Sequence, residues 1–240
     1  MNNTLLSIVV PCYNEADSIG ELLEAYATAI NRDDVEVVLV NNGSTDNTRD
    51  VLESLRSKYL HFLKVVSVEK NEGYGHGIVS GLKAASGEFI GWTHGDLQTP
   101  PSDILKALDI IEIENKSKFL FIKGKRKGRP LSDRFFTAGM SIFETIYFRT
   151  ALFDIFAQPN IFHRNFFATW ENPPKDFTLD LYVLHTAKKR NLIIIRLPVY
   201  FLTRKYGQSS WNTGLSGRLE FIKRNISFST ELKRVLKNKY

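Results

Sequence analysis

The chain has 240 residues, of which 43% are hydrophobic and 24% charged, with 15 glycines and 8 prolines. This composition is that of one large folded domain, and it excludes disordered, collagen-like and low-complexity classes. A single cysteine, Cys12, excludes an internal disulfide and a zinc site built from cysteines alone. No uncharged apolar run reaches the roughly 18 residues of a membrane-spanning helix. The start, Met1–Thr4, lacks the basic region of a signal peptide, so the expected location is the cytoplasm.

The net charge of +6 is distributed unevenly along the chain. Residues 1–100 carry 7 Lys and Arg against 14 Asp and Glu, whereas residues 101–240 carry 25 against 12. The basic second half favours a partner with phosphate groups, such as a phosphorylated ligand or an anionic lipid surface. The acidic first half argues against a nucleic acid that follows the whole molecule, and we expect no nucleic-acid partner.

In the first hundred residues, aliphatic and β-branched runs alternate with amphipathic segments. The runs predict four buried strands, at Leu5–Val10, Val35–Val40, Phe62–Val68 and Glu88–Thr93. Apolar residues at helical spacing predict helices between them, around residues 19–30, 51–59 and 78–85. This alternation predicts an α/β fold with a mostly parallel, doubly wound sheet, which binds ligands at the carboxyl ends of its strands.

The second half continues the alternation less regularly. The sequence predicts a helix from Pro101 to about Asn115, a strand over Phe119–Lys123 and a long aromatic-rich helix over Ser132–Phe153. Residues 157–175 are expected to be irregular. A helix over Phe177–Lys189, a strand over Leu192–Pro198 and a basic helix from Gly214 are expected to follow.

Each of the first four predicted strands is followed by a loop of polar, turn-forming residues. Because such loops meet at one rim of a parallel sheet, four in succession point to a binding site there. In the fourth loop, Asp96 offers a carboxylate to a divalent cation that neutralises a nucleotide diphosphate, with His94 or Gln98 beside it. A capping or turn aspartate is the alternative interpretation. The glycines at 73, 75 and 77 permit close approach of a ligand, or simply make the loop flexible.

Taken together, these loops resemble a known family. Val9–Glu15, Val40–Asp46, Asn71–Gly75 and Gly95–Gln98 with Pro100-Pro101 resemble the inverting family 2 glycosyltransferases, whose fold is of the GT-A type. The more similar branch is that of the dolichyl- and polyprenyl-phosphate sugar synthases. Further matches to that branch are Gly124-x-Arg126, Arg134, Asp154 and Arg204-x-x-Gly207-x-Ser209. The segments Asp154–Pro159 and Asp176–Asp180 look like members that assemble bacterial polysaccharides.

The resemblance implies metal-dependent transfer of a sugar from a nucleotide-sugar to a polyprenyl phosphate or a lipid-linked glycan. Of the possible donors, we favour a UDP-sugar over a GDP-sugar. The nucleotide-binding residues that the resemblance implies are Pro11, Tyr13, Glu15, Asn42, Asp46, Gly75 and Asp96, with Asp46 at the pocket's edge or stabilising its loop. The implied ligands of Mg²⁺ or Mn²⁺ are Asp96, Gln98 and His94. The implied acceptor-phosphate residues are Arg126, Arg134, Arg204 and Ser209. Residues 1–212 would form the GT-A-type domain, with a nucleotide-binding half at 1–100 and an acceptor half at 101–212.

Three features depart from the family's pattern. Asn41 and Asn42 stand where two aspartates are common, and Ala138 stands where a serine is often found. His94 replaces the first carboxylate of the usual Asp-x-Asp pair, which weakens a hard-cation site because imidazole prefers softer metals. A catalytically impaired nucleotide-binding or scaffolding protein is therefore the alternative function.

The acceptor decides whether the reaction needs a base. A phosphate is already anionic near neutral pH, whereas a sugar hydroxyl must lose a proton to a base. Asp180, on the helix expected beside the site, is the candidate base, and Asp154 is a second candidate catalytic residue. A solvent-facing helix carboxylate is the alternative interpretation of Asp180. Displacement at the anomeric carbon would invert configuration, and the metal and basic groups would stabilise the departing diphosphate.

The tail, residues 213–240, is expected to be a basic amphipathic helix. Residues 214–240 hold seven Lys and Arg against two Glu, along an apolar stripe. Such a helix fits an anionic membrane surface, and it fits equally well packing on its own domain or on a second subunit. Peripheral binding to the inner face of the cell membrane and homo-oligomerisation are thus both open.

Overall fold

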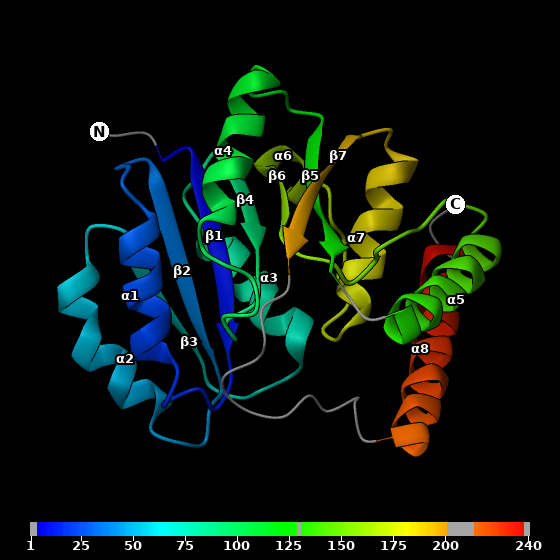
Figure 1. Cartoon of the computed structure of the whole chain (residues 1–240), viewed down its shortest axis with the longest axis horizontal. Coiled ribbons are helices and arrows are strands. Elements are labelled where there is room, and N and C mark those ends of the chain that lie inside the picture. The colour runs from blue at the N-terminus through cyan, green and yellow to red at the C-terminus, as the bar shows by residue number, and fades with distance from the viewer. Residues whose placement is uncertain (1–3, 129–130, 201–213, 238–240) are drawn as a thin grey trace.

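A seven-stranded sheet lies at the centre of the molecule (Figure 1). The computed structural model describes residues 4–128, 131–200 and 214–237. The strands are β1 (Leu6–Cys12), β2 (Val35–Asn42), β3 (Leu63–Val68), β4 (Phe89–Trp92), β5 (Leu120–Lys127), β6 (Asn160–His163) and β7 (Ile193–Tyr200). Their order in the sheet is β3-β2-β1-β4-β6-β5-β7.

All strands except β6 run in the same direction. β1 pairs in parallel with β2 on one side and with β4 on the other, and β3 pairs in parallel with β2. β6 is antiparallel to both β4 and β5, and β7 is parallel to β5. The strand order reverses between β1 and β4, and ligands of such sheets bind in the crevice at that point.

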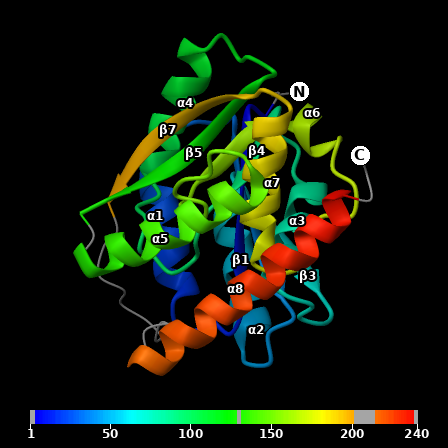
Figure 2. The same ribbon diagram turned by 90° about the vertical axis from the view of Figure 1, so that its right-hand side faces the viewer.

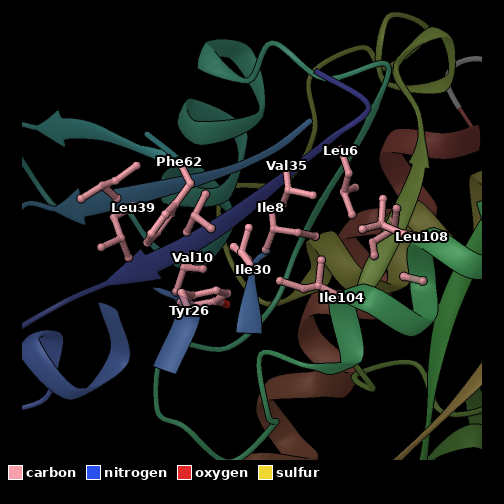
Figure 3. Packing of buried hydrophobic residues seen from close by; sticks show 14 of the residues in the cluster. Leu6, Ile8, Val10, Tyr26, Ile30, Val35, Leu39, Phe62, Ile104 and Leu108 are labelled. Atoms are coloured by element: carbon pink, nitrogen blue, oxygen red, sulfur yellow. The ribbon is translucent and has the colours of Figure 1, made fainter. Parts of the chain in front are cut away.

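Helices cover both faces of the sheet. One face carries α1 (Ile19–Ala29), α2 (Thr48–Arg56) and α4 (Asp103–Ile113), and the other carries α3 (Tyr74–Ala84), α6 (Arg164–Phe167) and α7 (Thr178–Lys189). Because side chains alternate along a strand, Ile8 and Val10 face the first layer of helices and Val9 faces the second. Figure 3 shows the first cluster, in which Val10 lies close to Tyr26 of α1 and Ile8 lies close to Ile30.

The segment from 157 to 175, expected to be irregular, contains both β6 and α6. That expectation was wrong because β6 is only four residues long and has no alternation of its own. Asn160 and His163 are polar, yet both are buried, because β6 is inserted between β4 and β5. Tertiary pairing, not local pattern, makes this strand.

The aromatic-rich helix, α5 (Leu131–Phe148), ends five residues earlier than predicted. Arg149 adopts a left-handed backbone with φ of 52°, and the N–H of Thr150 donates to Thr145 O at 3.2 Å. A left-handed residue after the last turn is a common way for a helix to end.

The C-terminal helix α8 (Gly214–Lys237) lies beside α5, as Figures 1 and 2 both show. Ser229 Oγ donates to Glu144 Oε1 at 2.5 Å, and Lys233 Nζ donates to Tyr147 O at 2.5 Å. Leu232 is buried in the same cluster as α7. The described part of α8 therefore packs on its own chain. Within the described ranges, no helix is both long and apolar enough to cross a membrane.

Candidate active site

The loops after β1 and β2 are joined to each other at the carboxyl ends of the strands. The backbone N–H of Thr45 donates to Asn14 Oδ1 at 2.8 Å, and that of Asn14 donates to Ser44 Oγ at 3.0 Å. These contacts are exposed and uncharged. Tyr13, which is 46% exposed, lies at the surface of the same loop. The two loops thus form one polar rim that a ligand can reach.

Asp46 stabilises this pair of loops. Its Oδ1 accepts from the N–H of Thr48 at 3.0 Å, and its Oδ2 accepts from the N–H of Ala16 at 3.4 Å. Burial raises the pKa of Asp46, but the hydrogen bonds from Thr48 and Ala16 outweigh burial and lower it. Glu15 extends the network, since its N–H donates to Thr48 Oγ1 at 2.9 Å and its Oε2 accepts from Ser18 Oγ at 2.6 Å.

The loop after β4 lies beside the end of β1. A Cβ placed on Gly95 would lie 3.4 Å from Pro11 O. Asp96, the next residue, therefore lies near the end of β1, where the strand order reverses. Between Asp96 and Gln98, Leu97 adopts a left-handed backbone with φ of 57°. The N–H of Gln98 donates to Asp96 Oδ1 at 3.1 Å. Asp96 is therefore held at the rim by a tight turn.

The donor atoms of this loop suit a cation that arrives with a phosphate ligand. In the part of the chain that the structure describes, no group of three or more His, Cys, Asp and Glu is placed to hold a metal by itself. Hard divalent cations take further oxygen ligands from water and from bound phosphates. The carboxylate of Asp96 and the amide oxygen of Gln98 fit such a cation, and the imidazole of His94 is the softer ligand.

Asn42 and Gly75, two of the expected nucleotide-binding residues, contact the protein's own backbone. Asn42 is 4% exposed, and its Nδ2 donates to Gly73 O at 3.1 Å. A Cβ placed on Gly75 would lie 2.5 Å from Pro174 O and 2.8 Å from Asp176 O. The close approach that Gly75 permits is thus with residues 174–176, and Asn42 fixes the loop that carries it.

Beside this rim, β5 carries a lysine in the interior of the sheet. Lys123 is fully buried, and its Nζ donates to Ile155 O at 2.6 Å, to Ala157 O at 2.7 Å and to Asn160 Oδ1 at 2.7 Å. The same Nζ lies 3.9 Å from Asp180 Oδ1. Burial lowers the pKa of Lys123, and the charge of Asp180 opposes that shift.

Asp180 lies in the first turn of α7 and is 2% exposed. Its Oδ1 accepts from Asn160 Nδ2 at 2.9 Å. Burial raises the pKa of Asp180, while the charge of Lys123 and the hydrogen bond from Asn160 act in the opposite direction. The interpretation of Asp180 as a solvent-facing carboxylate is wrong, because this face of α7 packs against the sheet.

Two arginines bind the same stretch of backbone as Lys123. Arg126 Nη2 donates to Phe156 O, and Arg196 Nη2 donates to Phe153 O at 2.9 Å. Burial lowers the pKa of Arg196, and the neighbouring carboxylate of Asp154 opposes that shift. Asp154 thus lies within the electrostatic reach of the cations on β5 and β7.

We call Lys123, Arg126 and Arg196 the cation cluster. Arg126 is the one acceptor-phosphate candidate whose side chain the described ranges include. Arg134 belongs to α5, but its side chain lies outside the described residues, as do Arg204 and Ser209 entirely.

The sequence did not single out Lys123, Asn160 or Tyr74 as site residues. Tyr74 Oη accepts from Gln158 Nε2, and its ring stacks on Phe177 with centroids 4.9 Å apart. The signal for Lys123 was a lysine placed directly after the apolar run of residues 119–122. The signal for the other two was absent, because their partners are distant in sequence.

The polar loops lie at the switch point between β1 and β4, the place where α/β sheets of this kind bind their ligands. Residues 7–173 match the family described as Glycosyl transferase family 2, and the chain belongs to that family. The family and the fold class that the sequence predicted are confirmed.

Two relatives and one solved structure illustrate the similarity. A dolichol-phosphate mannosyltransferase of Pyrococcus furiosus is 33% identical over 107 residues, 45% of this chain and 30% of that protein. A dodecaprenyl-phosphate galacturonate synthase of Rhizobium johnstonii is 34% identical over 128 residues, 52% of this chain and 36% of that protein. The chain thus matches about a third of the length of these relatives.

The solved structure is a mannosyltransferase from Pyrobaculum calidifontis in complex with GDP-Man and Mn²⁺. It superimposes with a TM-score of 0.64 at 20% identity, over 84% of this chain and 58% of that chain. At this identity the comparison establishes the shared GT-A-type fold.

Proposed function

We propose that this chain transfers a sugar from a nucleotide-sugar to a polyprenyl phosphate, with Mg²⁺ or Mn²⁺ as cofactor. Membership of Glycosyl transferase family 2 supports the transfer, and the names of both relatives support a polyprenyl-phosphate acceptor. The rim formed by the loops after β1, β2 and β4 is the proposed nucleotide side. The cation cluster is the proposed acceptor side.

The burial of Asp180 is the observation that favours a phosphate over a sugar hydroxyl as acceptor. A general base must come within hydrogen-bond reach of the proton that it removes. Asp180 is 2% exposed and is already paired with Lys123 and Asn160. A phosphate acceptor needs no such base, so Asp180 and Asp154 serve catalysis by balancing the charge of the cation cluster.

Asp96 is the proposed centre of the metal site, with Gln98 and His94 as additional ligands. When bound, the cation neutralises the diphosphate that departs from the sugar. The chain's own contribution is to hold Asp96 at the switch point through the turn that Gln98 closes. Pro11 and Tyr13 lie on the neighbouring loop and are proposed to contact the nucleoside.

The proposed location is the cytoplasmic face of the membrane that contains the lipid acceptor. The charge surplus of residues 101–240 supports attraction to anionic lipid. We further propose that the donor is a UDP-sugar.

The test is a transfer assay with undecaprenyl phosphate in detergent, Mn²⁺, and UDP-glucose, UDP-galactose or GDP-mannose as donor. Calorimetric titration of UDP and GDP, with and without Mn²⁺, accompanies it. We expect metal-dependent binding of one nucleotide, and a loss of at least about 100-fold in turnover for Asp96→Ala. Asp109→Ala, which removes an exposed carboxylate from α4, is the matched control and is expected to be fully active.

Two outcomes contradict the proposal. If a folded protein binds neither UDP nor GDP, the scaffolding alternative replaces it. If the sugar is transferred to the hydroxyl of a lipid-linked glycan and not to undecaprenyl phosphate, the choice of acceptor is wrong.

A further inference from the structure

Lys123 occupies a position where an apolar side chain would be expected. The preceding residues of β5, Leu120, Phe121 and Ile122, are fully buried in the two hydrophobic clusters. An ammonium group in such surroundings costs several kcal/mol unless each of its protons is bound. Lys123 meets that condition with three acceptors at 2.6 to 2.7 Å.

Two of those acceptors belong to one short stretch of backbone. Lys123 binds Ile155 O and Ala157 O, and Arg126 binds the carbonyl between them, Phe156 O. Lys123 therefore binds the carbonyl groups on either side of Phe156 O, the carbonyl to which Arg126 donates. We call these contacts of Lys123 with residues 155–157 the clamp. A shift of residues 155–157 would move Phe156 O, the atom to which the Arg126 guanidinium donates.

The third acceptor fixes the orientation of an amide. An ammonium group only donates hydrogen bonds, so the oxygen of Asn160 must face Lys123. The amide nitrogen of Asn160 then faces Asp180 and donates to it at 2.9 Å. Asp180 in turn balances the charge of Lys123, from which it lies 3.9 Å away.

The groups that face the pair come from several elements. The charges of Lys123 and Arg126 on β5 and the hydroxyl of Tyr74 on α3 act on the buried Asp180. The charges that act on the buried Lys123 are those of Asp180, Arg126, Arg196 and Asp154. Lys123 and Asp180 balance each other as a pair, so Arg126 and Arg196 stand against Asp154 and leave one positive charge for an anion.

We infer that Lys123 is a positioning residue for the acceptor phosphate: it holds residues 155–157 so that Arg126 is seated to bind that phosphate. Asp180 and Asn160 keep Lys123 in place, and Arg126 is the group that meets the acceptor. This inference rests on the proposed function, because it takes the acceptor to be a lipid phosphate.

The experiment compares Lys123→Met with the wild type in the full chain. We expect the KM for undecaprenyl phosphate to rise at least about tenfold, while the KM for the nucleotide-sugar and the Kd of UDP or GDP with Mn²⁺ change less than twofold. The matched control is Lys125→Met, which removes an exposed lysine two residues away on β5. Its KM for the acceptor is expected to stay within twofold of the wild-type value.

Lys123→Met leaves Asp180 buried without its cation and can fail to fold for that reason. The double variant Lys123→Met/Asp180→Asn removes both charges and keeps an amide oxygen that can accept from Asn160 Nδ2. It is expected to fold and still to show the raised acceptor KM, because residues 155–157 have lost their clamp. An unchanged acceptor KM in either folded variant overturns the inference, as does a fall in kcat alone with both KM values preserved.

Hydrogen–deuterium exchange separates this inference from the proposed function. The peptide containing residues 153–160 is expected to exchange faster in both Lys123 variants than in the wild type and in Lys125→Met. If the wild type transfers no sugar to undecaprenyl phosphate but this difference is seen, the proposed function fails and the clamp stands. Equal exchange in all four proteins overturns the clamp.

Discussion

The two sides of the candidate site are held together by different forces. At the rim, Asn14, Ser44 and Thr45 join the first two loops through exposed, uncharged hydrogen bonds. On the other side, the fully buried Lys123 joins β5 to β6 and to the 155–157 stretch beside its partner Asp180. Exposed polar contacts exchange readily with water or with a ligand, whereas a buried charge network is fixed before the ligand arrives. We infer that the proposed nucleotide side is adaptable and that the proposed acceptor side is preorganised.

The two sides meet where α3 begins. Gly75 approaches the backbone of residues 174–176, the N–H of His76 donates to Lys175 O at 3.0 Å, and Tyr74 stacks on Phe177. This joint connects the loop after β3 to the start of α7, which carries Asp180. How independently the two sides can move therefore depends on how firmly this joint is packed.

The largest effect is expected from Gly75→Ala, which tests that joint. Its new methyl group would lie 2.5 Å from Pro174 O and 2.8 Å from Asp176 O, both of them backbone atoms that cannot rotate away. We expect a loss of about 3 kcal/mol in the free energy of unfolding. Urea denaturation followed by circular dichroism measures it.

Gly20→Ala is the matched control, because nothing lies within 4 Å of a Cβ at that position in α1. Replacing a helical glycine there is expected to stabilise the protein by up to about 1 kcal/mol. If both variants are as stable as the wild type, the joint is loose and the two sides move independently.

Sequence patterns predicted the parallel part of the sheet well and the acceptor side less well. β1 to β4 and their loops follow from local alternation, because each strand is a short aliphatic run and each loop contains turn-forming residues. The strand β6 was missed because its residues are buried only through pairing with β4 and β5. Likewise, no local pattern shows that Lys123, Asn160 and Asp180 converge, since 57 positions of chain separate the first from the last. The sequence offered Asp180 as a candidate site residue, but it did not predict that the side chain is buried.

The second-largest effect is expected in the pH dependence of stability, since the proposed acceptor side contains buried ionisable groups. His185 of α7 packs beside Phe148, and among the residues that the structure describes its buried Nδ1 has no hydrogen-bond partner. Burial lowers its pKa to about 4, with a smaller contribution from the charge of Lys189. The unfolded chain therefore binds more protons than the folded one between about pH 6.5 and 4. The contribution of His185 to stability is complete above pH 6.5 and is lost as the pH falls through this range.

His185→Leu is expected to be at least as stable as the wild type at pH 7. At pH 5 its advantage is expected to grow by on the order of 1 kcal/mol, because solvent screens part of the effect of burial. Urea titrations at both pH values measure the difference. His61→Gln, at an exposed position, is the control and should follow the wild type at both. An advantage that does not change with pH would mean that His185 titrates normally in the folded protein.

A smaller effect is expected from Asp46→Ala on the nucleotide side. The substitution removes the acceptor of the Thr48 and Ala16 N–H groups. A capping interaction of this kind contributes about 1 kcal/mol. Asp46→Asn keeps one acceptor oxygen and should lose less. If the rim is adaptable, calorimetry will show that the Kd of UDP or GDP weakens more in Asp46→Ala than stability does; a loss of stability alone contradicts adaptability.

The smallest effect is expected from the ion pair that crosses the joint. Lys175 Nζ and Glu72 Oε2 lie 2.5 Å apart, yet the side chains are 62% and 44% exposed. Ion pairs this exposed are screened by salt and contribute little to stability. In a double-mutant cycle of Glu72→Gln and Lys175→Gln, we expect a coupling that lies within experimental error at 0.5 M NaCl. The joint between the two sides would then depend on the packing of Gly75 and Tyr74, because the charges across it can be removed without loss. A coupling that persists at high salt would show instead that electrostatic attraction closes the joint, and Gly75→Ala would be expected to lose less than predicted above.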